Sequence, residues 1–216
     1  MKPKIVVEGT VGAGKTTLIN LISARLKLKP LFELTDEKLV ELLSLFYVNP
    51  AKWGFHLQMY FLTKRFQQME LAKKLGNVVM DRCIYCDHIF PMVLLKRGEM
   101  SRLEYEIYKE IHNEFLRYSS PPKLMIYLRC STQTAIERIK KRGREWELTI
   151  DENYWYALNE EYENFFSSYN LSPILIVESD RLDENFRGIE NVVSSVLKVQ
   201  RRGVWIYDGD KLVRRS

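Results

Sequence analysis

Near the start of the chain, two glycines, a lysine and a threonine have the spacing of a phosphate-binding loop. The stretch GTVGAGKT fits the pattern G-x-x-x-x-G-K-[ST], in which backbone N–H groups surround phosphate oxygens. The lysine of this pattern reaches the terminal phosphates and the threonine binds magnesium. The sequence therefore predicts a nucleoside triphosphate site made by Gly9, Thr10, Val11, Gly12, Ala13, Gly14, Lys15 and Thr16.

Acidic and basic residues follow two other apolar stretches. Glu33 ends one predicted strand, and Asp81-Arg82 comes directly after another. Ligands of parallel sheets bind beyond the carboxyl ends of the strands, so these side chains are expected at the phosphate site. Glu33 could accept a proton from an attacking hydroxyl, and Asp81 could hold magnesium beside Thr16. A helix-capping acid and a plain ion pair are the structural alternatives.

A second basic group lies at the end of a predicted helix. Arg138 and Arg142 share one helix face, Gly143 ends the helix and Arg144 follows. Mobile arginines that close over phosphates neutralise the charge that develops during phosphoryl transfer. A solvated basic helix end is the alternative. The spacing alone does not decide between them.

The long helix predicted at Ala51–Leu75 carries polar groups in an apolar stripe. Phe55, Gln58, Leu62 and Arg65 fall on one face. Because amides and guanidinium groups are rarely buried unpaired, they need partners there. Gln58 can donate and accept hydrogen bonds, which suits the edge of a base. A dimer surface explains the spacing equally well.

Strands and helices alternate along the chain, which predicts an α/β fold with a five-stranded parallel sheet flanked by helices. The predicted strands are Ile5–Glu8, Pro30–Glu33, Val78–Asp81, Leu124–Leu128 and Ile174–Val177. The predicted helices are Thr17–Leu28, Glu37–Tyr47, Ala51–Leu75, Tyr85–Arg97, Arg102–Arg117, Thr132–Arg142, Glu152–Tyr169 and Glu184–Val199. Residues 203–214 are expected to form a small β-hairpin around Asp208-Gly209, and residues 1–216 a single domain.

The composition narrows the class of protein. The net charge of +5 suits a phosphate-binding protein, and no long basic arm indicates nucleic acid. No apolar run is long enough to cross a membrane, and no signal peptide is expected. Three cysteines, an odd number, argue against a disulfide framework and favour the cytoplasm. Cys83 and Cys86 lack the second pair of a four-cysteine zinc site, so we expect them to be small packing residues, with a metal or redox role as the alternative.

Taken together, these motifs resemble the deoxynucleoside kinase family, over nearly the whole chain from Gly9 to about Phe186. GTVGAGKTT, which includes Thr17, is similar to its P-loop, and FYVNPAKWGFHLQMY to its substrate helix. Asp81-Arg82-Cys83 is similar to its Asp/Glu-Arg-Ser motif, and ERIKKRGREWE to its arginine lid, here about 138–147. The resemblance implies a P-loop kinase fold, ATP and Mg²⁺ as cofactors, and a homodimer.

The resemblance also implies a substrate site. Glu33 would be the general base, although Leu34 replaces the usual proline and Asp36 and Glu37 are rival acids. Arg82 would orient the hydroxyl and keep Glu33 ionised, while Lys15 and the lid arginines neutralise the phosphoryl group. The remaining substrate residues would be Tyr47 and Glu147 at the 3′-hydroxyl, and Trp53, Gln58, Arg65, Asp87 and Phe90 around the base.

The Arg65 and Asp87 pair accompanies purine and deoxycytidine preference in the family, so thymidine is expected to be the poorer substrate. One alternative is a thymidylate-type nucleoside monophosphate kinase, which needs an arginine where this chain carries acids after Glu33. Another is a non-catalytic nucleotide-binding or nucleic-acid-binding P-loop protein. The expected partner is a small-molecule deoxynucleoside.

Overall fold

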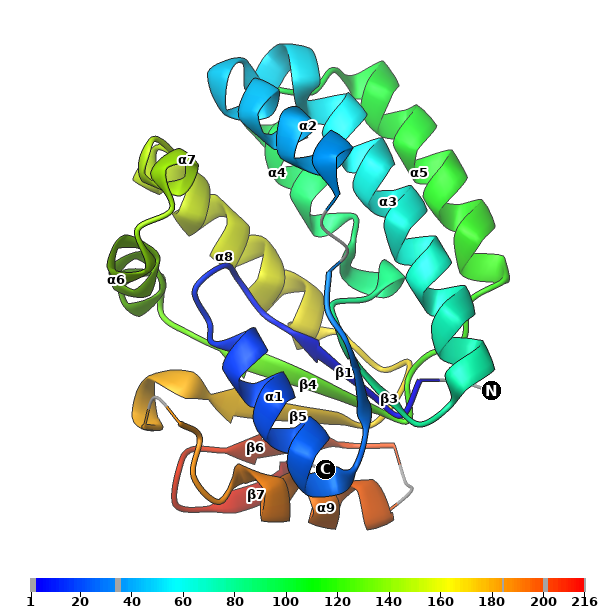
Figure 1. Ribbon diagram of the computed structural model, residues 1–216, viewed down its shortest axis with the longest axis vertical. Coiled ribbons are helices and arrows are strands. Elements are labelled where there is room, and N and C mark those ends of the chain that lie inside the picture. Colours follow the sequence, from blue (N-terminus) through cyan, green and yellow to red (C-terminus); the bar gives the residue numbers. More distant parts are fainter. Residues whose placement is uncertain (1–2, 34–35, 184, 200–201, 216) are drawn as a thin grey trace.

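One twisted sheet forms the centre of the molecule (Figure 1). The computed structural model describes residues 3–33, 36–183, 185–199 and 202–215, without the side chains of Glu145 and Trp146. The strand order is β2-β3-β1-β4-β5-β6-β7. The strands are β1 (Ile5–Glu8), β2 (Lys29–Leu31), β3 (Val78–Asp81), β4 (Leu124–Arg129), β5 (Ile174–Glu178), β6 (Val204–Tyr207) and β7 (Leu212–Arg215).

Successive residues of the inner strands enter two separate cores. In β1, Val6 packs with helices on one face of the sheet, whereas Ile5 and Val7 pack on the other. This alternation is why the inner strands are apolar throughout. One face is covered by α1 (Lys15–Leu26) and α9 (Ile189–Val199). The other is covered by α3 (Pro50–Leu75), α4 (Ile89–Lys96), α5 (Arg102–Arg117) and α8 (Glu152–Ser167).

Polar caps define where several helices begin. Asp36 caps α2 (Glu37–Val48) by accepting from the N–H of Leu39. Asn49 does the same for α3, and Pro50 occupies its first turn. Ser101 and Glu104 form a reciprocal capping box on α5. These side chains satisfy N–H groups that have no partner inside the helix, so they fix the residues at which the helices begin. Most of the predicted helix starts are confirmed.

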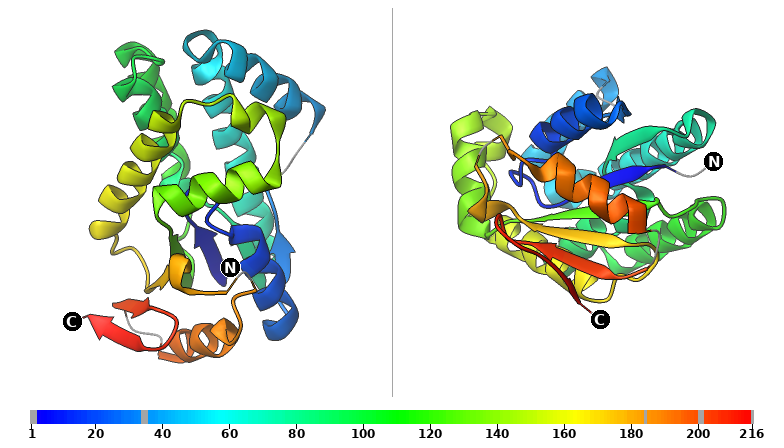
Figure 2. Two further views of the ribbon diagram at one scale, coloured as in Figure 1. Left: turned by 90° about the vertical axis from the view of Figure 1, so that its left-hand side faces the viewer. Right: turned by 90° about the horizontal axis from the view of Figure 1, so that it is seen from below.

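The C-terminal hairpin is present, but the prediction of a five-stranded sheet is wrong. Strand β6 pairs parallel to β5, and β7 pairs antiparallel to β6, which makes seven strands. Figure 2 shows this hairpin, in red, along one edge of the sheet. Trp205 of β6 is buried in the core beneath α9. The hairpin therefore extends the sheet instead of standing apart from it.

The helix predicted at Tyr85–Arg97 is also wrong as a single element. A short 3-10 helix, η1 (Ile84–Cys86), precedes α4, and the two are separated at Asp87 and His88. The Ile84 carbonyl accepts from Nε2 of His112 at 2.7 Å, so it has a partner outside the helix. The Asp87 side chain is likewise held by other elements. Contacts with distant residues therefore interrupt the predicted helix between η1 and α4.

The last predicted helix begins later than its pattern suggests. Helix α9 starts at Ile189, and Glu184 lies outside the described residues. Phe186 and Gly188 just before it have positive φ angles of 51° and 82°, which a right-handed helix excludes. Shorter elements complete the chain: α6 (Thr132–Arg142), α7 (Glu145–Leu148), which was not predicted, and η2 (Ser179–Arg181). Within the described residues, no helix is long and apolar enough to cross a membrane.

The role of the hairpin can be tested by removing its buried aromatic side chain. Trp205 is 4% exposed, so Trp205→Ala should lower the free energy of unfolding by about 3–5 kcal/mol, as for other buried aromatics. Val213 on β7 is 54% exposed, and Val213→Ala should change it by less than about 0.5 kcal/mol. Urea unfolding followed by circular dichroism measures both. Equal, small effects would mean that the hairpin is not part of the cooperative fold.

Candidate active site

The glycine-rich loop between β1 and α1 has the geometry of an anion cradle. Gly9, Gly12 and Gly14 have φ angles of 150°, 84° and 95°, which L-residues with side chains rarely adopt. A Cβ on Gly12 would lie 2.5 Å from the Ala135 carbonyl oxygen. Gly14 caps α1 without a side-chain hydrogen bond. The loop therefore packs tightly on α6 and directs the N-terminus of α1 at the site, where it favours negative charge.

Lys15 turns back into this loop. Its Nζ donates to the carbonyl oxygens of Gly9 and Thr10 at 3.0 and 2.9 Å. Burial, together with the nearby charge of Arg82, lowers the pKa of Lys15 to about 7. An anion in the loop would favour the charged ammonium. Thr16 and Thr17 follow in the first turn of α1 and are exposed.

Asp81 lies at the end of β3, in the strand next to β1, with its side chain 9% exposed. Its Oδ1 is buried and has no hydrogen-bond partner among the described residues. A buried carboxylate oxygen of this kind normally has a partner. Together with the hydroxyl of Thr16, it offers the oxygen ligands that Mg²⁺ prefers. The donor set therefore fits a magnesium ion.

Arg82 occupies a constrained position directly after Asp81. Its φ angle is 65°, an uncommon conformation for a residue other than glycine. The guanidinium lies 3.7 Å from the Glu8 carboxylate, donates to the Tyr162 hydroxyl and stacks over the Phe90 ring at 4.9 Å. Arg82 and Glu8 are 8% and 0% exposed. Strained backbone of this kind is found where the surrounding structure holds a side chain in a required position.

A buried guanidinium on α3 joins three carboxylate-bearing segments. Arg65 donates from Nη2 to Glu33 at 2.8 Å, from Nε to Asp87 at 3.3 Å, and from Nη1 to the Asp81 carbonyl at 3.0 Å. Arg65 is 3% exposed, and Tyr108 donates to the second oxygen of Asp87. Burial raises the pKa of Asp87 and Arg65 opposes this. Arg65 is therefore the direct partner of both acids.

Arg65, in addition to the expected Arg82, keeps Glu33 ionised. Burial acts to raise the pKa of Glu33, but the charge of Arg65 and then that of Arg82 outweigh it, so the pKa lies below its ordinary value. The direct contact is with Arg65. Asp36, a rival acid, caps α2 and also binds Tyr60 and Lys64. Its oxygens are thus engaged in structural contacts.

The arginines of the lid segment divide into two groups. Arg138 donates to the Ala13 carbonyl at 3.4 Å and to Ser179, so it lies against the phosphate loop. Arg142 donates to Glu147 at 2.6 Å, and Arg144 lies 3.6 Å from the same carboxylate. Gly143, with a φ angle of 71°, ends α6 between them. Glu147 thus holds the two outer arginines on the lid, whereas Arg138 is already at the loop.

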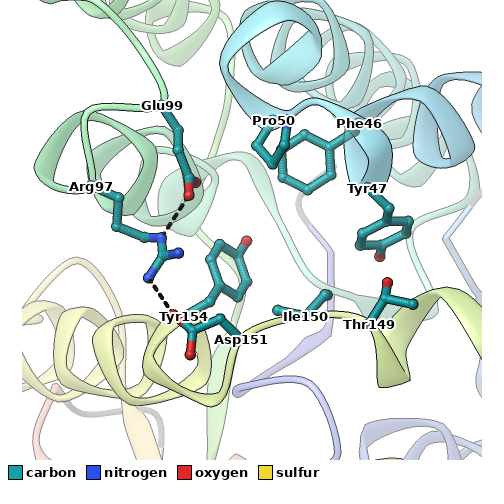
Figure 3. Close-up of a pocket in the computed structure, with 9 residues that line it drawn as sticks. All are labelled: Phe46, Tyr47, Pro50, Arg97, Glu99, Thr149, Ile150, Asp151 and Tyr154. Carbon is teal, nitrogen blue, oxygen red and sulfur yellow. Dashed lines mark hydrogen bonds and ion pairs between the residues drawn. The ribbon is translucent and has the colours of Figure 1, made fainter.

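A cavity of about 160 Å³ lies between the lid and the substrate helices. Figure 3 shows the Tyr47 hydroxyl pointing toward Thr149 on one side of it, with Arg97 bonded to Glu99 and Asp151 on the opposite side. Burial raises the pKa of Tyr47, and Glu147 adds to this effect. The residues lining the cavity are Phe46, Tyr47, Pro50, Arg97, Glu99, Thr149, Ile150, Asp151 and Tyr154.

The remaining predicted substrate residues lie on α3. Gln58 is 4% exposed, and its amide has no hydrogen-bond partner in the described part of the chain. Trp53, one turn before it, is half-buried beside His56 and Lys52. An amide in this position could exchange paired hydrogen bonds with a planar ligand.

Three buried polar side chains were not predicted. Glu8 accepts from the Cys83 N–H at 2.8 Å and from the Tyr162 hydroxyl. Tyr108 supports Asp87. A charged residue ending the apolar strand at Ile5–Glu8 was a usable signal for Glu8. The tyrosines give no such signal, because a tyrosine on an apolar helix face is ordinary core.

This geometry defines a P-loop enzyme site with carboxylates and arginines beside the phosphate cradle. The family model described as Deoxynucleoside kinase matches residues 5–200, and the chain belongs to the deoxynucleoside kinase family. It is therefore a kinase that phosphorylates deoxynucleosides.

Relatives of known function agree with this assignment. The chain is 37% identical over 203 residues to a deoxyadenosine/deoxycytidine kinase of Bacillus subtilis, covering 90% of this chain and 92% of the relative. It is 37% identical to a deoxyguanosine kinase of Lactobacillus acidophilus, covering 83% and 82%. The deoxyadenosine kinase of M. mycoides, solved with bound dATP, superposes with a TM-score of 0.79 at 37% identity, covering 88% of this chain and 99% of that one.

The contacts of Arg65 with Glu33 and Asp87 lead to a prediction about the stability of the protein. Arg65→Gln leaves Asp87 buried without its cationic partner, so the free energy of unfolding should fall by about 3–5 kcal/mol. Glu33→Gln leaves the Arg65–Asp87 pair in place and removes a carboxylate that is 38% exposed, which should cost less than about 1 kcal/mol. Urea unfolding of both variants tests this. A similar loss in both would contradict the central role of the Asp87 pair.

Proposed function

We propose that the chain transfers the γ-phosphate of ATP to the 5′-hydroxyl of a deoxynucleoside, with purine deoxynucleosides or deoxycytidine preferred over thymidine. The observation that supports this most directly is Glu33. It is an ionised, partly exposed carboxylate held by buried Arg65, and it lies two residues after β2, which ends at Leu31 and not at Glu33 as predicted. A carboxylate with these properties can accept the proton of an attacking hydroxyl.

In the proposed reaction, the hydroxyl is held between Glu33 and Arg82 while it attacks the terminal phosphoryl group. The rigid setting of Arg82, fixed by Glu8, Tyr162 and Phe90, favours such positioning. Lys15 and Arg138 already lie at the loop and stabilise the charge on the phosphoryl oxygens. Magnesium, held by Thr16 and Asp81, would neutralise phosphate charge.

Lid closure would bring Arg142 and Arg144 toward the phosphates, and Glu147 toward the sugar. Glu147 lies near Tyr47 at the cavity, which supports the assignment of both to the 3′-hydroxyl. The segment Glu33-Leu34-Thr35-Asp36-Glu37 after β2 carries three acids and no arginine, so it suits a neutral sugar hydroxyl better than the phosphate of a monophosphate. This argues against the thymidylate-type alternative.

For the base, we propose that Gln58, Arg65 and Asp87 read its polar edge and that Trp53 and Phe90 contribute apolar contact. Gln58 and Asp87 are buried polar groups on neighbouring elements, as hydrogen-bond readout requires. The relatives named for deoxyadenosine, deoxycytidine and deoxyguanosine support a preference among these substrates.

We also propose a single domain over residues 1–216, a homodimer and a cytoplasmic location, with no nucleic-acid or membrane partner. Exposed apolar side chains on α5, Leu103 and Ile107, support self-association. All three cysteines are free and buried, which suits a reducing compartment. Sedimentation equilibrium should give a mass near twice 25.7 kDa.

The direct test is a substrate panel. The protein is incubated with Mg·ATP and each of the four deoxynucleosides, and separately with the four deoxynucleoside monophosphates. We expect monophosphate from deoxyadenosine, deoxyguanosine or deoxycytidine, and less from thymidine. Diphosphate formed only from monophosphates would select the rival kinase, and no product from any acceptor would select a non-catalytic protein.

The general base is tested by Glu33→Gln, with Asp36→Asn as matched control. Removing the proton acceptor should lower kcat by roughly 10²–10⁴-fold and change the deoxynucleoside Kd by only a few-fold. Asp36→Asn should retain most of the turnover because that side chain serves α2 and Tyr60. Near-normal turnover in Glu33→Gln, or a larger loss in Asp36→Asn, would remove the base assignment.

Nucleotide binding should be coupled to proton uptake at Lys15. In the ligand-free protein its pKa is about 7, so most molecules carry a neutral lysine at pH 8. A bound triphosphate raises this pKa toward its ordinary value, so Mg·ATP binding at pH 8 should take up close to one proton. At pH 6 Lys15 is already protonated and the uptake should disappear. Titration calorimetry in buffers of different ionisation enthalpy measures the number of protons taken up. Equal proton uptake at pH 6 and pH 8 would show that Lys15 is not its source.

A further inference from the structure

Beneath the phosphate loop, three buried side chains bring metal-binding atoms together. The carboxylate of Glu8 and the sulfur atoms of Cys83 and Cys86 all lie within 4.8 Å of one another. The three residues are 0%, 1% and 2% exposed. They come from the end of β1 and from the turn that carries η1. Sequence spacing alone gives two ligands, and the fold adds the third.

Local structure explains why the two sulfurs meet. The Cys86 N–H donates to the Cys83 carbonyl at 3.3 Å, which closes one turn of 3-10 helix. In such a turn, side chains three residues apart lie on the same side. The N–H of Cys83 donates to Glu8 at 2.8 Å, which holds the carboxylate against this turn. The ligand atoms are thus fixed by backbone hydrogen bonds.

We propose that Glu8, Cys83 and Cys86 form a binding site for one thiophilic divalent cation, of which Zn²⁺ is the natural example. Zinc binds sulfur at about 2.3 Å and carboxylate oxygen at about 2.0–2.2 Å. Two sulfurs on one tetrahedral zinc are then about 3.8 Å apart, and the sulfur atoms of Cys83 and Cys86 lie within 4.8 Å of each other. Three protein ligands leave one position of the tetrahedron for another donor.

Charge balance favours a thiophilic cation in this buried place. When a dication binds two thiols as thiolates, two protons leave, so the net charge of the sulfur–metal unit does not change. The remaining negative charge of Glu8 is balanced by Arg82 at 3.7 Å. The buried cluster therefore avoids the large cost of an uncompensated charge. Mg²⁺, which prefers oxygen ligands, is not expected here.

The test uses the tag-free full-length chain, produced with Zn²⁺ or Cd²⁺ in the medium because the cluster is closed to solvent. After gel filtration, elemental analysis should find about one cation per chain. The Cd²⁺ form should show the ultraviolet thiolate-to-cadmium band with the intensity of two thiolates, and a higher Tm than the metal-free protein. This readout does not depend on the proposed kinase reaction.

Matched variants assign the ligands. Cys83→Ala and Cys86→Ala should each reduce retained cation at least tenfold and weaken the cadmium band. Cys130→Ala should leave both unchanged, because this buried cysteine contacts Asp180 away from the cluster. Circular dichroism checks that each variant folds. If a cluster variant does not fold, the Cys130→Ala variant alone decides the ligand assignment: an unchanged two-thiolate cadmium band in it supports Cys83 and Cys86 as the sulfur ligands, and its loss contradicts the proposal. A wild-type chain that retains no cation, or equal loss in Cys130→Ala, overturns the proposal.

Discussion

The site depends on one buried cation. Arg65 is held in the core by α3, and its guanidinium bonds a carboxylate after β2, a carbonyl at the end of β3 and a carboxylate after η1. A buried charge is tolerated only when its partners surround it, so these segments are constrained to meet at one point. That point lies at the carboxyl ends of β2 and β3, beside the loop that follows β1. The apolar core thus sets the layers, and Arg65 sets the relative positions of the acids.

A second buried pair works in the same way beneath the phosphate loop. Glu8 ends β1 and contacts Arg82, which follows β3. Tyr162 from α8 bonds both side chains. Arg82 is kept in a positive-φ conformation that isolated chains avoid, and the surrounding contacts stabilise it. The neighbouring strands β1 and β3 therefore place Glu8 and Arg82 at the site, and Tyr162 on α8 fixes their orientation.

The contacts of the lid segment, residues 138–147, differ from the buried contacts of Arg65 and Arg82. Arg142 and Arg144 depend on the single carboxylate of Glu147 and are substantially exposed, whereas Arg138 is anchored to the loop and to Ser179. Glu147, the common partner of Arg142 and Arg144, is only 6% exposed, so a movement that separated these pairs would have to give the buried carboxylate another partner. In the proposed reaction, Arg142 and Arg144 are therefore the arginines that a lid movement would bring to the phosphates, whereas Arg138 already lies at the loop.

Local patterns of residues predict most of the helices and strands and the residue types of the site. Apolar strands, helix caps and the glycine-rich loop are local patterns, so the boundaries of β1, β3, α5 and α6 and the composition of the phosphate cradle could be read directly. Which of these groups contact one another is seen only in the folded chain: Arg65 contacts Glu33, Glu8 contacts Arg82 and lies beside the two cysteines, and the hairpin pairs with β5. The break at Asp87 also came from distant partners, His112 and Tyr108. Such contacts join residues that are far apart in the chain. They are strong because both partners are buried together, and the burial of a distant partner cannot be read from a local sequence pattern.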